Sequence, residues 1–191
     1  FLENPAASKS FDLVYVGSIS LTRGIVETIA VLEKGPYRYL LLGDYRNQRT
    51  SDTIQALPAY ATQVNYRPFT SSRQTIQTAI YEAKIGMANL QNVANFRVAY
   101  LIKIFEYMAA GLPVIATNFP LWQTIIEQHE CGLTIPPDDP SALVAAIDHL
   151  LDNPEQATQM GQNGRRAVEK HYNWEQEEQK LLALYTQLLA E

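Results

Sequence analysis

An apolar strand that directly follows a glycine-terminated helix is the feature that most constrains the fold of this chain. Apolar residues recur at helical spacing from Ile104 to Ala109, and Gly111 stands where a glycine commonly ends a helix. Pro113 then leads into the run 114–116, Val-Ile-Ala, which has no polar alternation. Such a run is typical of a strand buried on both faces, and strands of that kind belong to parallel sheets covered by helices. The segment therefore predicts an α/β fold.

The same alternation of strands and helices extends along the chain. The predicted strands cover residues 11–16, 39–42, 63–66, 85–88, 114–116 and 133–135. The predicted helices cover residues 23–33, 51–57, 71–83, 101–110, 121–128 and 174–189, and two more begin after Asp139-Pro140 and Asn153-Pro154, where a capping side chain precedes proline. We expect a doubly wound, six-stranded parallel Rossmann-like sheet with helices on both faces and further helices at the C-terminal end. Ligands of such sheets bind outside the carboxyl ends of the strands, where residues 89–98 form a predicted binding loop.

Composition limits the classes of function. With 191 residues and 47% hydrophobic content, the chain can form one large domain or two small ones. We expect a leader or interdomain linker over residues 1–10 and a Rossmann-like domain over residues 11–191. The formal net charge of -5 argues against a general nucleic-acid binder. A single cysteine, Cys131, cannot form an intrachain disulfide and fits a reducing cytoplasm. No apolar run is long enough to cross a bilayer, so we expect at most peripheral membrane contact.

The loop after the first predicted strand places a cation near the carboxyl edge of the sheet. Gly17-Ser18 follow that strand, and Arg23 stands at the start of the next predicted helix, close to the positive end of its dipole. A guanidinium there can hold two phosphate oxygens and stabilise a diphosphate leaving group without a metal. The plainer alternative is a surface arginine beside an ordinary strand-helix turn.

The predicted helix over residues 101–110 supplies stronger candidates. Glu106 offers a carboxylate, which can accept hydrogen bonds from the two adjacent hydroxyls of a ribose. Lys103 lies three residues earlier on about the same face, so it either contacts a phosphate or pairs with Glu106. The backbone amides of Leu101, Ile102 and Lys103 open the helix and can point toward an anion. A solvent-facing Glu106 is the alternative interpretation.

Other parts of the sequence argue against several enzyme classes. His129, His149 and His171 have no spacing that builds a metal site, and we expect surface roles for them and neither a metal nor a cofactor. The chain has no Gly-x-Ser-x-Gly elbow, no Gly-Lys-Ser/Thr phosphate loop and no Gly-x-Gly-x-x-Gly fingerprint, which weakens hydrolase, nucleoside triphosphatase and dehydrogenase interpretations. Trp122 and Glu127 follow the fifth predicted strand. We expect Trp122 to pack in the core or at an interface, and Glu127 to cap a helix or pair locally.

The stretch FEYMAAGLPVIAT, which begins at Phe105, resembles the donor-site signature of GT-B glycosyltransferases of retaining family 4, the glycosyl transferases group 1. The resemblance covers nearly the whole chain, from about Leu13 to Leu189, and Tyr172-Asn173-Trp174-Glu175 resembles the tail of the family. It implies that the chain is the C-terminal half of a GT-B enzyme, with residues 11–191 as its nucleotide-sugar-binding domain. In this family the helix glutamate, here Glu106, binds the ribose of the donor.

The resemblance also implies a reaction and a set of donor-binding residues. Arg23 and Lys103 are expected to be catalytic, because they steady the departing diphosphate while a hexosyl group passes, with retention, to a glycan, lipid or other acceptor. The base is expected near the ends of the second and third strands, where Tyr45 or Tyr66 can stack on it, although packing is the plainer role. The full donor-binding set is Gly17, Ser18, Arg23, Tyr66, Arg67, Leu101, Ile102, Lys103 and Glu106.

The chain departs from the family pattern at several positions. Ser18 replaces the first of two cations, and Val98 stands where family members commonly carry a second glutamate, eight positions before Glu106. Tyr100-Leu101-Ile102 replaces the Leu-Pro-Thr of some bacterial relatives. These departures favour a second interpretation, a non-catalytic nucleotide-sugar-binding module that has lost turnover. A third, a sugar-nucleotide epimerase of the same architecture, needs an acid/base cluster that the sequence does not offer.

The resemblance implies two partners, a nucleotide-sugar donor and a separate N-terminal acceptor-binding domain. The sequence opens at Phe1 without an initiator methionine and leads straight into a strand, so we expect it to be part of a longer protein. The 191 residues of this sequence, without that domain, are expected to be inactive. The whole protein is expected to act in polysaccharide or glycoconjugate assembly, in the cytoplasm, at the inner face of the membrane through the missing half.

Overall fold

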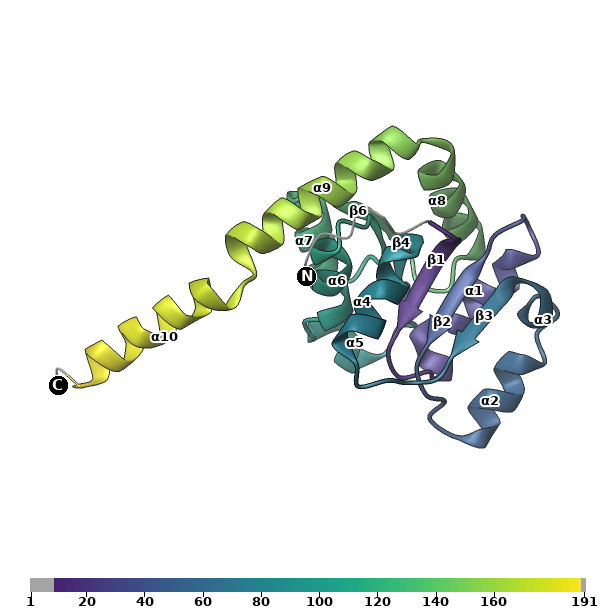
Figure 1. The fold of residues 1–191 in the computed structure, drawn as a ribbon, viewed down its shortest axis with the longest axis horizontal. Coiled ribbons are helices and arrows are strands. Elements are labelled where there is room, and N and C mark those ends of the chain that lie inside the picture. Colours follow the sequence, from purple (N-terminus) through teal and green to yellow (C-terminus); the bar gives the residue numbers. More distant parts are fainter. Residues whose placement is uncertain (1–8, 190–191) are drawn as a thin grey trace.

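The computed structural model describes residues 9–189, which form one sheet of six parallel strands with helices on both faces (Figure 1). The order across the sheet is β3-β2-β1-β4-β5-β6, so the winding direction reverses between β1 and β4. The predicted fold class is confirmed, whereas most of the predicted linker over residues 1–10 lies outside the described residues. The strands are β1 (Phe11–Val16), β2 (Tyr39–Leu42), β3 (Val64–Arg67), β4 (Ala83–Ala88), β5 (Val114–Thr117) and β6 (Gly132–Ile135).

Helices connect the strands and follow the last one. A 3-10 helix, η1 (Leu21–Arg23), precedes the first α-helix. The α-helices are α1 (Ile25–Leu32), α2 (Gln48–Gln55), α3 (Tyr60–Gln63), α4 (Arg73–Tyr81), α5 (Ala94–Val98), α6 (Ile102–Ala109), α7 (Pro120–Gln128), α8 (Pro140–Asp152), α9 (Pro154–His171) and α10 (Trp174–Leu189). No helix in the described part of the chain is long and apolar enough to cross a membrane.

The predictions were wrong at two local points. Residues 89–98 are not a loop throughout, because the short helix α5 lies within them and Phe96 packs against the core. Asn153 does not cap α9 with its side chain, since its Nδ2 instead donates to His149 O at 2.8 Å and closes α8. Asp139 does cap α8, accepting a hydrogen bond from Ala142 N at 2.9 Å.

Two hydrophobic cores lie on opposite faces of the sheet. Alternate residues of β1 divide between them: Leu13 and Tyr15 pack with α1 and α8, whereas Val14 and Val16 pack with α4 and α6. Both faces are therefore covered, which is why the strands read as unbroken apolar runs in the sequence.

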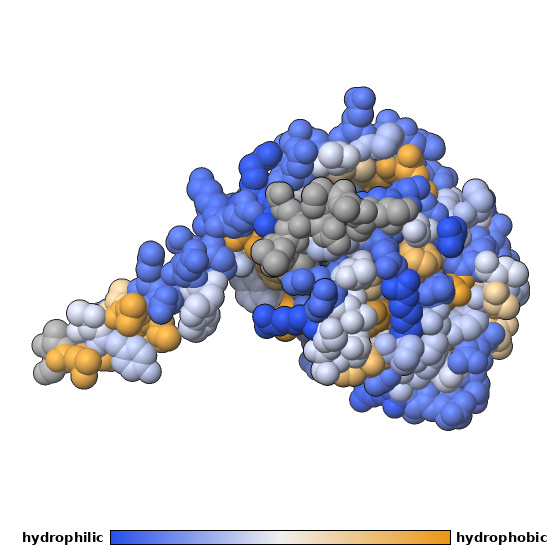
Figure 2. All heavy atoms as spheres, viewed as in Figure 1, coloured by the Kyte–Doolittle hydropathy of each residue, from blue (hydrophilic) through white to orange (hydrophobic). Residues whose placement is uncertain are grey.

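The C-terminal helix α10 extends away from the rest of the molecule (Figure 1), and none of its described residues is buried. Figure 2 shows hydrophobic residues gathered toward its far end. The exposed large side chains are Trp174, Leu181, Leu182, Leu184, Tyr185, Leu188 and Leu189. An unpartnered apolar helix of this kind commonly marks an interaction surface.

Tyr107 fixes helix α6 to the centre of the sheet. Its ring fills the space that Gly86 leaves open, since a Cβ on Gly86 would lie 2.3 Å from that ring. Its hydroxyl is fully buried and accepts a hydrogen bond from Val16 N at 3.1 Å, beyond the last β1–β4 pair at Val14 and Gly86. The end of β1 and the C-terminal half of α6 are thus joined by one buried hydrogen bond.

Replacing Tyr107 with phenylalanine should leave the Val16 N–H buried without this acceptor. We expect Tyr107→Phe to lower the free energy of unfolding by about 1 to 3 kcal/mol, measured by urea denaturation. The matched control is Tyr185→Phe on α10, whose side chain is exposed and which should change little. Equal, small effects of the two substitutions would contradict a structural role for the Tyr107 hydroxyl.

Candidate functional site

The candidate site lies at the carboxyl edge of the sheet, where the winding direction reverses between β1 and β4. Gly17 follows β1 with φ of 129°, and Gly24 precedes α1 with φ of 71°. A Cβ on Gly24 would lie 1.8 Å from Asn89 O, so only glycine allows the two loops to approach. The buried Asn89 side chain locks this contact by donating to Gly24 O at 3.2 Å and to Thr28 Oγ1 at 3.0 Å.

Lys103 is the most unusual side chain of the site. It is only 7% exposed, and its Nζ has no hydrogen-bond partner in the described part of the chain. The Nζ lies 3.2 Å from the centroid of the Tyr15 ring and 3.5 Å from where a Cβ on Gly17 would stand. Helix α6 therefore holds a buried ammonium group directly against the loop after β1.

Burial governs the electrostatics of this group. It lowers the pKa of Lys103 well below its usual range, and the nearby Arg23 lowers that pKa further. Burial also raises the pKa of Glu106, while Lys103 and Arg73 oppose that rise. Glu106 is half-buried and forms no ion pair with Lys103 among the described residues. Two cations thus lie in one region, where Glu106 offsets the effects of burial and of Arg23 on the pKa of Lys103 only in part. This arrangement favours an anionic ligand.

Arg23 stands at the end of η1, just before Gly24, rather than in the first turn of α1 as predicted. Its guanidinium carbon lies 4.8 Å from the centroid of the Phe96 ring, which comes from α5. The ring holds a flat guanidinium in place and leaves its N–H groups for other acceptors. Arg23 is electrostatically coupled to Lys103 and to Tyr15, so the three side chains share one region.

Three other predicted donor-binding residues, Ser18, Leu101 and Ile102, lie near Lys103 in the chain or in the loop that it faces. Ser18 is exposed, and its carbonyl accepts a hydrogen bond from the Tyr15 hydroxyl at 2.8 Å. Leu101 is the N-cap of α6, where its carbonyl accepts from Ile104 N at 3.0 Å. Ile102 opens the helix and is 72% exposed. The first amides of α6 therefore lie at the edge of the site, with an apolar side chain beside them.

Two predicted base-binding residues do not join this group. Arg67 pairs with Glu82 at 2.7 Å, and its guanidinium carbon lies 5.6 Å from the Phe11 ring. Phe11 and Glu82 lie at the amino ends of β1 and β4, so Arg67 reaches away from the carboxyl edge. Tyr66 packs against Tyr45 with ring centroids 5.0 Å apart, an arrangement that satisfies packing without a ligand.

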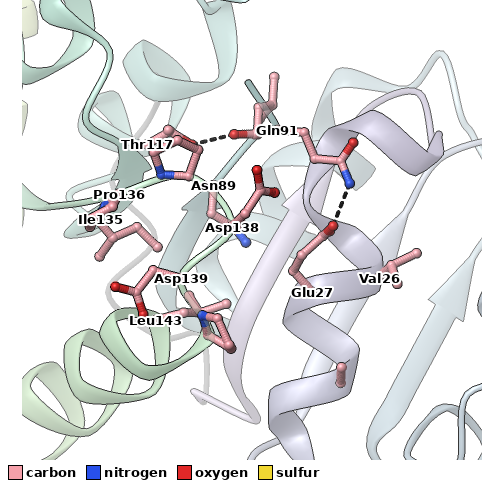
Figure 3. A pocket seen from close by; sticks show the side chains of 14 residues that line it. Val26, Glu27, Asn89, Gln91, Thr117, Ile135, Pro136, Asp138, Asp139 and Leu143 are labelled. Atoms are coloured by element: carbon pink, nitrogen blue, oxygen red, sulfur yellow. Dashed lines mark hydrogen bonds between the residues drawn. The ribbon is translucent and has the colours of Figure 1, made fainter. Parts of the chain in front are cut away.

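A separate acidic pocket of about 310 Å³ lies between α1 and the loop from β6 to α8 (Figure 3). Glu27 borders it from α1, and Asp138 and Asp139 border it from the loop. Glu27 Oε1 accepts from Gln91 Nε2 at 2.5 Å, while its buried Oε2 has no partner among the described residues. No arginine or lysine lines this pocket, so its chemistry differs from that around Lys103.

Sequence reasoning missed Tyr15, Phe96, Asn89 and the acidic pocket. Tyr15 lies inside a strand and Phe96 inside a predicted loop, so neither pattern indicated a role beside a cation. The acidic pair in Pro136-Pro137-Asp138-Asp139 was the available signal for the pocket.

Trp122 is buried as predicted, with its Nε1 donating to Ala99 O at 2.7 Å. Within residues 9–189, no group of three or more acidic, histidine or cysteine side chains is placed to hold a metal ion.

A family model described as glycosyl transferases group 1 matches residues 3–167. Among curated proteins, the MMP alpha-(1->4)-mannosyltransferase of Mycolicibacterium hassiacum is 26% identical over 109 residues, which cover 56% of this chain and 26% of that protein. The putative glycosyltransferase EpsD of Bacillus subtilis is 29% identical over 163 residues, which cover 83% of this chain and 41% of that protein. The matched segments thus cover less than half the length of each of these two relatives.

Solved structures share the fold. The C-terminal domain of a glycosyl transferase group 1 family protein (LpcC) from Francisella tularensis superposes with a TM-score of 0.71 at 22% identity, over 87% of this chain and 88% of that one. HepE of Anabaena, solved in complex with UDP, superposes with a TM-score of 0.75 at 16% identity, over 92% of this chain and 49% of that one.

The unpartnered ammonium of Lys103 should lower the stability of the protein without ligand. We expect Lys103→Met to raise the free energy of unfolding by about 1 to 3 kcal/mol at pH 7, measured by urea denaturation. Because the folded-state pKa is lowered, the unfolded chain binds more protons between the two pKa values, and wild-type stability rises with pH in that window. The advantage of the methionine variant should therefore shrink as the pH approaches 10.

The exposed Lys34 gives the matched control, because Lys34→Met should alter neither the stability nor its pH dependence. A loss of stability in Lys103→Met would show instead that the contact with the Tyr15 ring outweighs the burial of the ammonium.

Proposed function

This chain belongs to the glycosyl transferases group 1, and on that premise we propose that it is the donor-binding half of a retaining family 4 glycosyltransferase. It binds a nucleoside-diphosphate sugar, whose hexosyl group the whole protein transfers to a glycan, lipid or other acceptor. The observation that carries this proposal is the buried Lys103 Nζ, which has no acceptor among the described residues and faces the loop after β1. A diphosphate would supply the missing acceptor.

The two cations have the roles that departure of a diphosphate requires. Arg23 can hold two phosphate oxygens through its planar guanidinium, and Lys103 adds a compact positive charge beside Gly17. Both charges stabilise the leaving group as negative charge develops on it, so the proposal needs no metal. Arrival of the diphosphate also raises the pKa of Lys103 toward its usual range, because an adjacent anion favours the ammonium form.

Glu106 lies three residues beyond Lys103, about one turn further along α6. Its half-buried carboxylate is the proposed acceptor for the two ribose hydroxyls. This order along the helix matches the order of groups in a nucleotide, with the phosphates at the start of α6 and the ribose one turn later. Tyr45 and Tyr66 are the aromatic candidates for the base. Arg67 is a weaker candidate because Glu82 already pairs with it.

The acidic pocket of Figure 3 suits a different part of the donor. It lies close to η1, since Gln91, which lines it, donates from its backbone N to Thr22 O at 3.1 Å. Its carboxylates accept hydrogen bonds, and the absence of lysine or arginine from its lining makes it unsuitable for phosphates. We assign it to the hydroxyl groups of the transferred sugar.

The acceptor site belongs, in this proposal, to a separate N-terminal domain. The curated relatives exceed the length of this chain more than twofold, which leaves room for such a domain. The exposed apolar residues of α10 supply a surface for it, among them Leu184 and Leu188. With that domain, the protein would work in the cytoplasm at the inner face of the membrane; without it, the domain described here binds donor but transfers nothing.

A second candidate function is a non-catalytic module that binds nucleotide sugars. It is favoured by Val98, which is 79% exposed at the end of α5 where the family commonly has a glutamate. Tyr100 and Ile102 extend this apolar stretch. The two candidates differ in turnover and share donor binding, so sugar transfer by the full-length protein discriminates between them.

Calorimetric titration with UDP, GDP and ADP tests the donor site and identifies the base. We expect one of the three to bind, and Glu106→Gln to weaken it by about 1 to 3 kcal/mol through loss of hydrogen bonds to ribose. The control is Glu127→Gln on α7, which alters an exposed helical glutamate and should leave affinity unchanged. Unchanged affinity in a folded Glu106→Gln variant would remove Glu106 from the site.

Arg23→Ala separates recognition of the phosphates from recognition of the nucleoside. We expect it to weaken the bound nucleoside diphosphate about tenfold or more, and to affect the corresponding nucleoside much less. Arg49→Ala, which changes an exposed arginine of α2, is the control. Equal losses for diphosphate and nucleoside would show that Arg23 is structural, through its contact with Phe96.

A further inference from the structure

A cation-rich hollow lies apart from the donor site, where the C-terminal ends of α7 and α9 meet. Its volume is about 380 Å³, and its lining includes His129, Glu130, Asn163, Arg166, Lys170 and His171. None of the predicted donor-binding residues lines it. We propose that this hollow binds a phosphate-type dianion, either as a small soluble phosphate ester or as a lipid headgroup. This inference is independent of the proposed transferase function.

The two permanent cations of the hollow have no acidic partner among the described residues. Arg166 and Lys170 are four residues apart on α9, so they lie on the same face of the helix. Neither takes part in any ion pair found among residues 9–189, and Arg166 Nη2 donates to the neutral amide oxygen of Asn163 at 2.5 Å. In a chain whose formal net charge is -5, two unpaired cations bordering one hollow favour an anion there.

Two imidazoles add charge that depends on pH. The rings of His129 and His171 stack with centroids 5.7 Å apart, and His129 Nε2 lies 2.9 Å from the Tyr172 hydroxyl. Burial and the neighbouring His171 lower the pKa of His129. A bound anion would counter the repulsion between the two imidazolium groups, so anion binding and proton uptake should be linked.

The other titratable groups around the hollow do not cancel this charge. Glu130 is the carboxylate of the lining, which leaves one excess cation before either imidazole is protonated. Glu127 accepts a hydrogen bond from Gln123, and Glu169 pairs with Arg165. The thiol of Cys131 stays neutral because burial raises its pKa to about 12, and burial raises the pKa of Tyr172 as well.

Favourable interaction of cations with the C-terminal end of the α9 dipole does not explain why all four basic side chains border the hollow. Lys170 and His171 lie in the last turn of α9, where cations are favourable without any ligand. Arg166 lies before that turn, and His129 follows a different helix, α7. The four groups share the hollow and do not share one helix end.

Proton NMR of the imidazoles gives a readout confined to the hollow. We expect sulfate, and then inorganic phosphate, to raise the apparent pKa of His129, to shift the ring-proton resonances of His129 and His171, and to leave those of His149 on α8 unchanged. Sulfate stays dianionic throughout, so a severalfold gain in its affinity from pH 8 to pH 6 would report protonation of the protein. Anion binding at Arg23 and Lys103 would not shift these two imidazoles selectively.

Three variants and one control test the assignment. Arg166→Ala and Lys170→Ala should each weaken sulfate binding about tenfold, the loss expected for a charge-assisted hydrogen bond. Glu130→Gln should strengthen it, because the substitution removes the opposing carboxylate. Arg49→Ala on α2 removes an exposed cation elsewhere and should have no effect. Thermal denaturation of each variant confirms that it is folded.

The source of the dianion is decided by comparing glycerol 3-phosphate with phosphatidylcholine vesicles that contain phosphatidic acid. Selective shifts with glycerol 3-phosphate support a soluble ester, and vesicle binding that Arg166→Ala abolishes supports a headgroup. Uniform shifts of all three histidines, or sulfate affinity that Glu130→Gln leaves unchanged, would overturn the proposal. Variants that lower thermal stability without changing anion affinity would show that the cations serve the α9 dipole only.

Discussion

The contact between Tyr107 and Gly86 positions the candidate site. The Tyr107 ring occupies the volume that a side chain at position 86 would fill, and its hydroxyl takes the buried amide of Val16 at the end of β1. This fixes α6 relative to β1 and β4, the two strands at which the sheet changes winding direction. Lys103 and Glu106 come from the same helix, so this buried contact helps to set their places at the carboxyl edge.

The site is electrostatically costly in the absence of ligand. Burying the Lys103 ammonium beside Arg23, with no hydrogen-bond partner for its Nζ among the described residues, opposes folding; the same burial lowers the pKa of Lys103. The ring of Tyr15 contacts Lys103 and the ring of Phe96 contacts Arg23, and these cation–π contacts reduce the cost. The rings carry no net negative charge, so they do not neutralise the two cations. An anionic ligand would offset the cost of burying these positive charges, and this is the physical basis for the proposed diphosphate site.

Positive and negative side chains cluster in separate regions of the molecule. The edge near Arg23 and Lys103 is cationic, the pocket between α1 and α8 is acidic, and the hollow between α7 and α9 is again cationic. The net charge of -5 reveals none of this, because it sums over regions that different ligands would meet separately. Local clusters therefore carry the functional argument in this protein.

The sequence by itself determined the α/β class, the six strands and the importance of α6, because buried parallel strands read as unbroken apolar runs and a helix shows its period and its glycine stop. The sequence did not determine which of the candidate site residues contact one another in the fold. Arg67 is the last residue of β3, and its side chain turns back to Glu82. Tyr15 and Phe96, which carried no signal in the sequence, contact the two cations. The acidic pocket and the hollow beside His129 likewise join residues far apart in the chain. Those encounters depend on side-chain packing between distant elements, which only the tertiary structure decides.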